Sequence, residues 1–164
     1  MNRRFIGAAF AGLLLLGACG GGGNTDTAQE GEENTPVEEA PSGEVSYFGT
    51  EFAFEGPETI GAGETIFTLD NTGEQPHMLV MVELLEGKTI DDVTTFIEEE
   101  GVEGKPPSWA KNVKMEAFAK PGKSDTAKPV ELTAGNYAML CFIGDKETKK
   151  SHAELGMVKG LTVE

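Results

Sequence analysis

Four side chains that can bind a metal ion lie in two separate segments of the sequence. Cys141, His152 and Met157 occur in this order near the C-terminus, where the residue pattern predicts a strand, a polar loop and a second strand. The only other histidine, His77, begins the apolar segment 77–85. A thiolate, two imidazoles and a thioether together suit a soft or borderline transition metal. The residue types therefore indicate one mononuclear metal site built from both segments.

Taken singly, each of these residues also has an ordinary structural explanation. Cysteine is often buried in a core, a histidine at the start of an apolar strand is usually hydrogen-bonded, and methionine fills irregular gaps. Their joint occurrence favours a metal site. A thiolate and two imidazoles form a trigonal site suited to both Cu(I) and Cu(II), and a weak axial thioether favours the reduced ion. Zinc is the competing metal, because thiolate and imidazole bind it well.

The N-terminus has the features of an export signal. Arg3 and Arg4 precede an apolar run over residues 5–16, which is too short to span a membrane as a helix. The string Leu16-Gly17-Ala18-Cys19 that follows resembles the lipobox of bacterial lipoproteins. The resemblance implies a signal peptide over residues 1–18, cleavage before Cys19 and lipidation of this cysteine. Several acyl chains on one residue would anchor the protein stably to a membrane.

A low-complexity linker follows, so that residues 19–43 comprise the lipidated cysteine and a spacer. The spacer is rich in Gly, Glu, Thr and Pro and contains no basic or aromatic residue. Such a segment buries too little apolar surface to offset its ordering entropy and is expected to be disordered. With Cys19 lipidated, Cys141 is left as the only thiol. Because a lone thiol in an exported protein is prone to oxidation, metal coordination is one way to protect it.

The composition limits the choice of partners. The formal net charge is −15, with 28 acidic and 13 basic residues. Binding to nucleic acid requires a basic surface, so we expect no nucleic-acid partner. An acidic surface steers encounters with cationic surfaces, which favours a partner with a basic docking face. We expect the protein itself to be a monomer in the bacterial cell envelope, with its folded domain outside the cytoplasm.

Residues 44–164 have the pattern of an all-β domain. About seven strand segments are separated by Gly- and Pro-containing turns, which favours an antiparallel sandwich. The expected strands cover residues 45–54, 65–69, 77–85, 113–119, 126–132, 137–143 and 155–163. One helix is expected after Thr89, which pairs with Asp92 as a capping box, and it ends near Gly101.

Two segments carry a family resemblance. The strings Gly135–Cys141 and His152–Val163 resemble the C-terminal signature of plastocyanins, azurins and other cupredoxins, and Asn71–His77 is similar to their first ligand segment. The resemblance covers residues 45–164 and implies a Greek-key β-sandwich with one copper ion. The implied ligands are His77, Cys141 and His152 in the equatorial plane and Met157 in the axial position. Tyr137 lies where such sandwiches often place a tyrosine corner.

The sequence departs from this family at two points. Ten residues, 142–151, separate the cysteine from the second histidine, where two to four are usual. A longer loop adds only a modest closure entropy, but a charged, flexible loop is expected to hold His152 less rigidly. The second departure is Met78, which stands where the family often has an asparagine that braces the cysteine loop.

Three functions agree with these features. The first is a membrane-anchored cupredoxin that carries single electrons on the extracytoplasmic side. The second is a lipoprotein that handles Cu(I) for delivery or protection, and the third is a metal-free cupredoxin-like module that binds a protein partner. Two histidines are too few for a multicopper enzyme, and we find no catalytic triad, carboxylate pair or phosphate loop. We therefore do not expect an enzyme.

Overall fold

The computed structural model describes residues 43–164. The predicted signal peptide (1–18), Cys19 and all of the predicted linker 19–43 except Gly43 lie outside the described residues. Among the residues that are described, no helix combines the length and the apolar character needed to cross a bilayer. The domain predicted over residues 44–164 begins with its first strand at Glu44.

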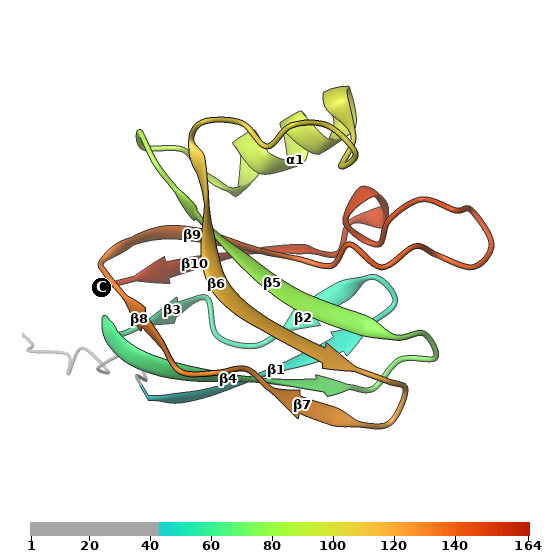
Figure 1. Cartoon of the computed structure of the whole chain (residues 1–164), viewed down its shortest axis with the longest axis horizontal. Helices are drawn as coiled ribbons and strands as arrows, with labels where there is room; N and C mark the ends of the chain where they lie inside the picture. The colour runs from blue at the N-terminus through green and yellow to red at the C-terminus, as the bar shows by residue number, and fades with distance from the viewer. Residues whose placement is uncertain (1–42) are drawn as a thin grey trace, which may run out of the picture. The chain divides into compact units, whose positions relative to one another are not determined.

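The described chain forms two facing β-sheets with one helix outside them (Figure 1). This is the predicted β-sandwich with one inserted helix. The first sheet has the strand order β2 (Ala53–Glu55), β1 (Glu44–Thr50), β4 (Gly63–Asn71) and β7 (Ser124–Thr126), and β8 (Val130–Leu132) also pairs with β4. The second sheet has the order β3 (Thr59–Ile60), β10 (Val158–Val163), β9 (Gly135–Leu140), β5 (His77–Leu84) and β6 (Ala110–Ala119).

The expected sandwich is present, but two of its strand pairs are parallel, where the sequence pattern favoured antiparallel pairing. β1 runs parallel to β4 from Glu44↔Ile66 to Gly49↔Asn71, and β3 runs parallel to β10. Parallel neighbours end at the same edge of a sheet. The turn after β1 and the turn after β4 therefore lie at the same end of the domain, and the second of these turns leads directly to His77.

Two of the predicted strands are each divided into two. The predicted strand 45–54 turns back at residues 51–52, so that β1 and β2 form an antiparallel hairpin. The predicted strand 126–132 is interrupted between β7 and β8. Pro129 lies in this gap and cannot donate a ladder hydrogen bond, which accounts for the interruption. The expected strand 113–119 begins earlier in the structure, because β6 also includes residues 110–112.

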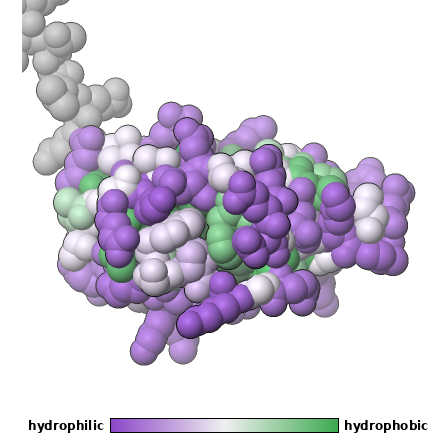
Figure 2. Space-filling model, turned by 90° about the horizontal axis from the view of Figure 1, so that it is seen from above, coloured by the Kyte–Doolittle hydropathy of each residue, from purple (hydrophilic) through white to green (hydrophobic). Residues whose placement is uncertain are grey.

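The main core lies between the sheets and includes Tyr47, Phe67, Leu69, Leu79 and Met139. Residues 44–49 of β1 alternate between exposed and buried, as a strand with one face on a core requires. Burial of large apolar side chains supplies the main favourable free energy of folding, and each contributes roughly 1.5–3 kcal/mol. The outer face shown in Figure 2 carries mainly hydrophilic side chains, in keeping with the charged composition.

Helix α1 (Ile90–Glu100) covers the outer face of the second sheet (Figure 1). The predicted capping box is present, because the backbone N–H of Thr89 donates to Asp92 Oδ2 at 2.9 Å. Val93 and Ile97 are the buried residues of the helix. They belong to a second apolar cluster that includes residues 84, 138, 140 and 153. This cluster lies behind the part of β9 that leads to Cys141, so the helix supports this strand.

Tyr137 forms the predicted tyrosine corner. Its hydroxyl donates to the carbonyl oxygen of Thr133 at 2.8 Å and accepts from the backbone N–H of the same residue at 3.3 Å. The ring is buried at the start of β9. These bonds fix the entry of the strand that ends next to Cys141.

Replacing Tyr137 with Phe tests the contribution of this corner. The Tyr137→Phe variant keeps the ring and loses the hydroxyl, so we expect the free energy of unfolding to fall by about 1 kcal/mol. Chemical denaturation of the variant and the parent protein measures the difference. An unchanged midpoint and slope would show that the corner does not stabilise the domain.

Candidate metal centre

His77 is placed by a hydrogen-bonded turn before β5. The buried Asn71 side chain donates through Nδ2 to the carbonyl oxygens of Gln75 at 2.7 Å and Ala119 at 2.9 Å. Its Oδ1 accepts the backbone N–H of Gly73 at 2.9 Å. The Asn71 side-chain amide thus forms hydrogen bonds within the turn and with β6. These bonds fix the position at which His77 enters the sheet.

Cys141 follows the last residue of β9 and is completely buried. The backbone N–H of Met78 lies 3.4 Å from its Sγ and donates to it. Desolvation by burial raises the pKa of the thiol, although the hydrogen bonds from Met78 and Ile143 partly oppose this shift. Cys141 is therefore protonated at neutral pH in the absence of a metal, and binding a metal ion would release this proton.

His152 lies close to Cys141 because hydrogen bonds close the base of the ten-residue loop between them, as in a β-hairpin. Gly144 and Ser151 form an isolated antiparallel bridge. The N–H of His152 donates to the carbonyl oxygen of Ile143 at 2.8 Å, and the N–H of Ala153 donates to that of Cys141 at 2.8 Å. The extra residues project beyond this closed base in Figure 1. Their number therefore has little effect on the position of His152.

Asp145 organises the projecting part of the loop. Its Oδ2 accepts the backbone N–H groups of Thr148 at 2.6 Å and Glu147 at 3.1 Å, and the Thr148 hydroxyl at 2.7 Å. The hydrogen bond from the Gln75 side chain and those from Thr148 hold the pKa of this carboxyl well below its usual range. The expected flexible loop is thus a hydrogen-bonded one.

The two ligand-bearing segments are joined through Gln75. Its Nε2 donates to Asp145 Oδ1 at 2.8 Å, and its Oε1 accepts the N–H of Lys146 at 3.2 Å. This amide connects the turn before His77 to the loop before His152. Gln75 thus braces the cysteine loop, a role for which the side chain of Met78 has no hydrogen-bonding groups. Met78 contributes only its backbone N–H, which donates to Cys141 Sγ.

The ligand atoms converge in one buried cluster. The candidate atoms of His77, Cys141 and His152 all lie within 4.8 Å of one another. The two Nδ1 atoms of the histidines are 3.2 Å apart, and Cys141 Sγ is 3.4 Å from His152 Nδ1. All three residues have an exposed fraction of 0%. The structure therefore brings together three of the four predicted ligands.

Met157, the predicted axial ligand, is also completely buried and lies beside the cluster. Its N–H donates to the carbonyl oxygen of His152 at 2.8 Å, and its carbonyl oxygen accepts the N–H of Cys141 at 3.3 Å. A Cβ built on Gly49 would lie 3.4 Å from His77 Cδ2 and 3.5 Å from Met157 Cε. His77 and Met157 thus both approach the same glycine. Ligation by Met157 stays a prediction.

Both imidazoles are suited to bind a metal as neutral ligands. Burial lowers the pKa of His77, against an opposing effect of the nearby Glu51 carboxylate. Burial also lowers the pKa of His152, and the proximity of His77 adds to this shift. Both rings are therefore neutral at physiological pH, so a metal ion does not have to displace a proton from an imidazolium.

The tip of the β1–β2 hairpin covers both histidines. Glu51 Oε1 lies 3.3 Å from His77 Nε2, and the Phe52 ring packs on His152 with the ring centroids 4.7 Å apart. The Nε2 atoms of the two histidines are buried without a hydrogen-bond partner in the described part of the chain. Because the His77 ring is neutral, the 3.3 Å contact places a carboxylate oxygen at the edge of an imidazole and is not an ion pair.

This arrangement fits a mononuclear metal ion. Two neutral ring nitrogens and one thiol face each other, and the residues around them exclude solvent. A thiolate with two imidazoles is the trigonal donor set of copper sites of the blue type. No carboxylate belongs to the cluster, so the donor set does not suit Mg²⁺ or Ca²⁺.

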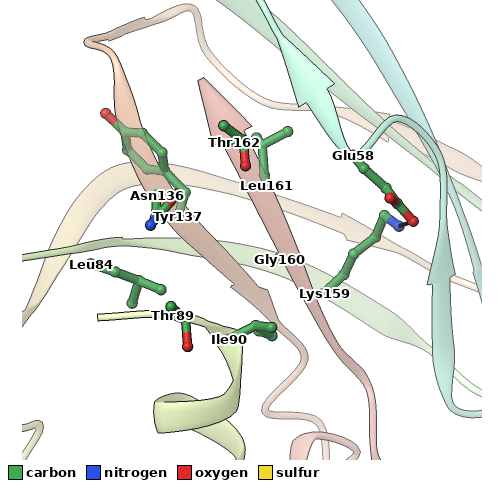
Figure 3. A pocket seen from close by; sticks show the side chains of 10 residues that line it. All are labelled: Glu58, Leu84, Thr89, Ile90, Asn136, Tyr137, Lys159, Gly160, Leu161 and Thr162. Atoms are coloured by element: carbon green, nitrogen blue, oxygen red, sulfur yellow. Dashed lines mark ion pairs between the residues drawn. The ribbon is translucent and has the colours of Figure 1, made fainter. Parts of the chain in front are cut away.

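A surface hollow elsewhere contains none of the four predicted ligands. It lies between the start of α1 and strands β9 and β10, where the side chains of Leu84, Ile90 and Tyr137 and the Glu58–Lys159 pair border it (Figure 3). The Glu58–Lys159 ion pair is 3.9 Å long, and Glu58 is largely exposed. The chemistry-bearing residues are thus in the buried cluster and not in this hollow.

A β-sandwich with a buried His–Cys–His cluster is typical of small β-proteins that have one metal site. The chain is similar to the dithionite-reduced auracyanin of Roseiflexus castenholzii, with 25% identity and a TM-score of 0.51 over 76% of this chain and 98% of that chain. The described domain therefore has the cupredoxin fold, and its cluster fits the site of a blue copper protein. The family resemblance predicted from the two sequence segments is confirmed.

Two further solved structures are more distant. Auracyanin A, a blue copper protein of Chloroflexus aurantiacus, has 17% identity and a TM-score of 0.48 over 74% of this chain and 98% of its own. An azurin of Methylomonas sp. strain J has 12% identity and a TM-score of 0.45 over 75% and 98%. No family model and no curated protein matches the sequence.

The structure adds four residues that the sequence analysis did not single out. Glu51 and Phe52 were placed inside a continuous strand, and nothing in the local pattern connects them with the histidines. Gln75 likewise has no sequence signal for its role as a bridge. Asp145 does have one, because aspartate side chains in loops often accept hydrogen bonds from neighbouring backbone N–H groups.

Replacing Asp145 with Ala tests whether the loop determines the metal affinity. The Asp145→Ala variant loses the hydrogen bonds inside the loop and the bridge to Gln75. We expect Cu(II) to bind about tenfold more weakly, as when the outer partners of metal ligands are removed. Competition with a chelator measures the affinity. Lys146→Ala, an exposed change in the same loop, is the control, and an equal loss in both variants would contradict the specific role of Asp145.

Proposed function

We propose that this protein binds one copper ion through His77, Cys141, His152 and Met157 and carries single electrons on the extracytoplasmic side of a bacterial membrane. The observation that carries the proposal is the convergence of two neutral imidazoles and one thiol in a completely buried cluster. When bound there, copper supplies a one-electron couple. The protein supplies a ligand geometry that suits both oxidation states.

Each residue has a distinct part in this proposal. His77, Cys141 and His152 would hold the copper ion, and Met157 would add a weak thioether ligand that favours Cu(I). The N–H of Met78 donates to Cys141 Sγ and stabilises charge on the thiolate. Asn71, Gln75 and Asp145 hold the two ligand segments in register. Because the ligands are held before the metal arrives, a change of oxidation state needs little rearrangement.

The similarity to auracyanin supports a role as an electron carrier rather than an enzyme. It extends over 98% of that chain at 25% identity. The partner proposed is a redox protein with a basic docking face, since this chain has a formal charge of −15. The protein acts as a monomer in this proposal.

We place the protein in the bacterial cell envelope on the basis of its N-terminal sequence. Residues 1–18 are the proposed lipoprotein signal peptide, and Cys19 is the proposed lipidated residue. Residues 19–43 are then the spacer between the lipid and the domain at 44–164. A spacer of this length and composition would let a tethered carrier reach its partners.

Visible absorption spectroscopy tests the copper centre. The full-length protein is purified reduced and metal-free and then receives one equivalent of Cu(II). We expect an intense charge-transfer band from the Cys141 thiolate to Cu(II). The Cys141→Ser variant removes the thiolate, so the band should be lost.

The alternative outcomes separate the competing functions. A colourless protein that still binds Cu(I) through its thiolate would favour copper handling over electron transfer. A protein that binds neither ion would contradict the copper proposal. The chain would then share only the fold with cupredoxins.

Fractionation of cells that express the protein tests the lipid anchor. We expect the parent protein in the membrane fraction and the Cys19→Ala variant outside it, because the substitution removes the lipidation site. Cys141→Ser is the matched control, since it changes the other cysteine and should remain in the membrane fraction. Equal membrane association of Cys19→Ala and the parent would contradict the anchor.

A further inference from the structure

We propose that Glu51 is a positioning residue of the metal centre, one that accepts the Nε2 proton of His77 and so directs Nδ1 of this ring at the metal. The inference rests on the copper site proposed above and adds a carboxylate–histidine–metal relay to it. It also assigns a function to the hairpin tip that the sequence patterns had placed inside a strand.

The carboxylate of Glu51 is held in place by the backbone that leads to His77. Its Oε1 accepts the N–H groups of Glu74 and Gln75, both at 2.8 Å. The same oxygen lies 3.3 Å from His77 Nε2. A carboxylate that accepts two backbone N–H groups is stabilised as an anion. A solvent-exposed carboxylate held by two backbone N–H groups therefore faces the outer edge of a buried imidazole.

The turn before His77 leaves room for this carboxylate. A Cβ on Gly73 would lie 2.5 Å from Glu51 Oε1 and 2.8 Å from its carboxyl carbon. Real Cβ contacts are not this short, so any larger residue at position 73 would displace the carboxylate. Gly73 is thus a second residue on which the position of Glu51 depends.

The protonation of the ring explains why an anion is useful here. His77 Nδ1 faces the cluster, only 3.2 Å from His152 Nδ1. A metal bound at Nδ1 requires its lone pair, so the single proton of the neutral ring must be on Nε2. Nε2 is buried and has no other partner in the described part of the chain. Glu51 is the acceptor that makes this tautomer favourable, as carboxylates do for metal-bound histidines in general.

The two histidines differ in the groups that lie next to their rings. The His152 ring packs on Phe52, and the carboxylates of Asp145 and Glu51 act on it only through longer-range electrostatics. Of the two histidines, only His77 has a carboxylate oxygen in direct contact with its Nε2 in the described part of the chain. A negative charge next to the ligand stabilises Cu(II) more than Cu(I), because the interaction grows with the charge of the ion. Glu51 thus lowers the reduction potential of the site.

The test compares Glu51→Gln with the matched control Glu55→Gln in the full-length protein at one pH. Glutamine keeps the size of Glu51 and an oxygen for the two backbone donors, so the fold should be retained. Glu55 is an exposed residue on β2 of the same hairpin, and its substitution removes the same charge. Gly73→Ala is a second variant that displaces the carboxylate without removing it.

Three measurements follow. Chelator competition gives the affinities for Cu(I) and Cu(II), voltammetry gives the reduction potential, and nitrogen-15 NMR of the metal-free protein gives the tautomer of His77. In Glu51→Gln we expect Cu(II) affinity to fall about 10- to 100-fold. Cu(I) affinity should fall less and the potential should rise. Gly73→Ala should change in the same direction, while Glu55→Gln should match the parent protein.

The outcomes separate this proposal from the copper proposal. Equal loss of Cu(I) and Cu(II) affinity with an unchanged potential, or a response no larger than that of Glu55→Gln, would overturn the role of Glu51. If the parent protein binds no copper, the copper proposal fails, and the NMR experiment still decides on Glu51. A proton on Nε2 of His77 in the parent that moves away from it in Glu51→Gln supports the relay, and an unchanged tautomer overturns it.

Discussion

The burial of two imidazoles and one thiol against each other is the constraint on which the rest of this structure depends. Buried polar groups are unfavourable unless they find partners, and these three have few partners outside the cluster. A metal ion would satisfy the two Nδ1 atoms and the sulfur at once. The protein therefore has to hold three residues from two distant segments in one place, and most of its polar side-chain network at this end does so.

The network has one component for each ligand. Asn71 sets the turn before His77, the closed base of the loop sets His152, and the end of β9 sets Cys141. Gln75 then connects the two segments through Asp145. Because the base of the long loop is closed by the Gly144–Ser151 bridge, extra residues can be added beyond it with little change at the metal. This explains how a ten-residue separation is compatible with the ligand geometry.

The parallel pairing of β1 with β4 has an equally direct consequence. It places the β1–β2 turn next to the turn before His77, which allows Glu51 and Phe52 to cover the two histidines. The centre is thereby shielded from water on the histidine side as well as on the cysteine side. Glu51 itself is exposed to solvent, so its carboxylate acts on the buried His77 ring through direct contact at 3.3 Å and not through a low dielectric constant.

The sequence by itself determined the sandwich class, the helix with its capping box, the tyrosine corner and the identity of the clustered ligands. These features follow from local signals: alternating apolar residues, turn residues and a characteristic order of His, Cys, His and Met. The tertiary structure alone decided the parallel strand pairs, the break at residues 51–52 and the bridge through Gln75. Glu51 and His77 meet only because two strands end at the same edge, and such a contact between distant segments leaves no periodic trace in the sequence.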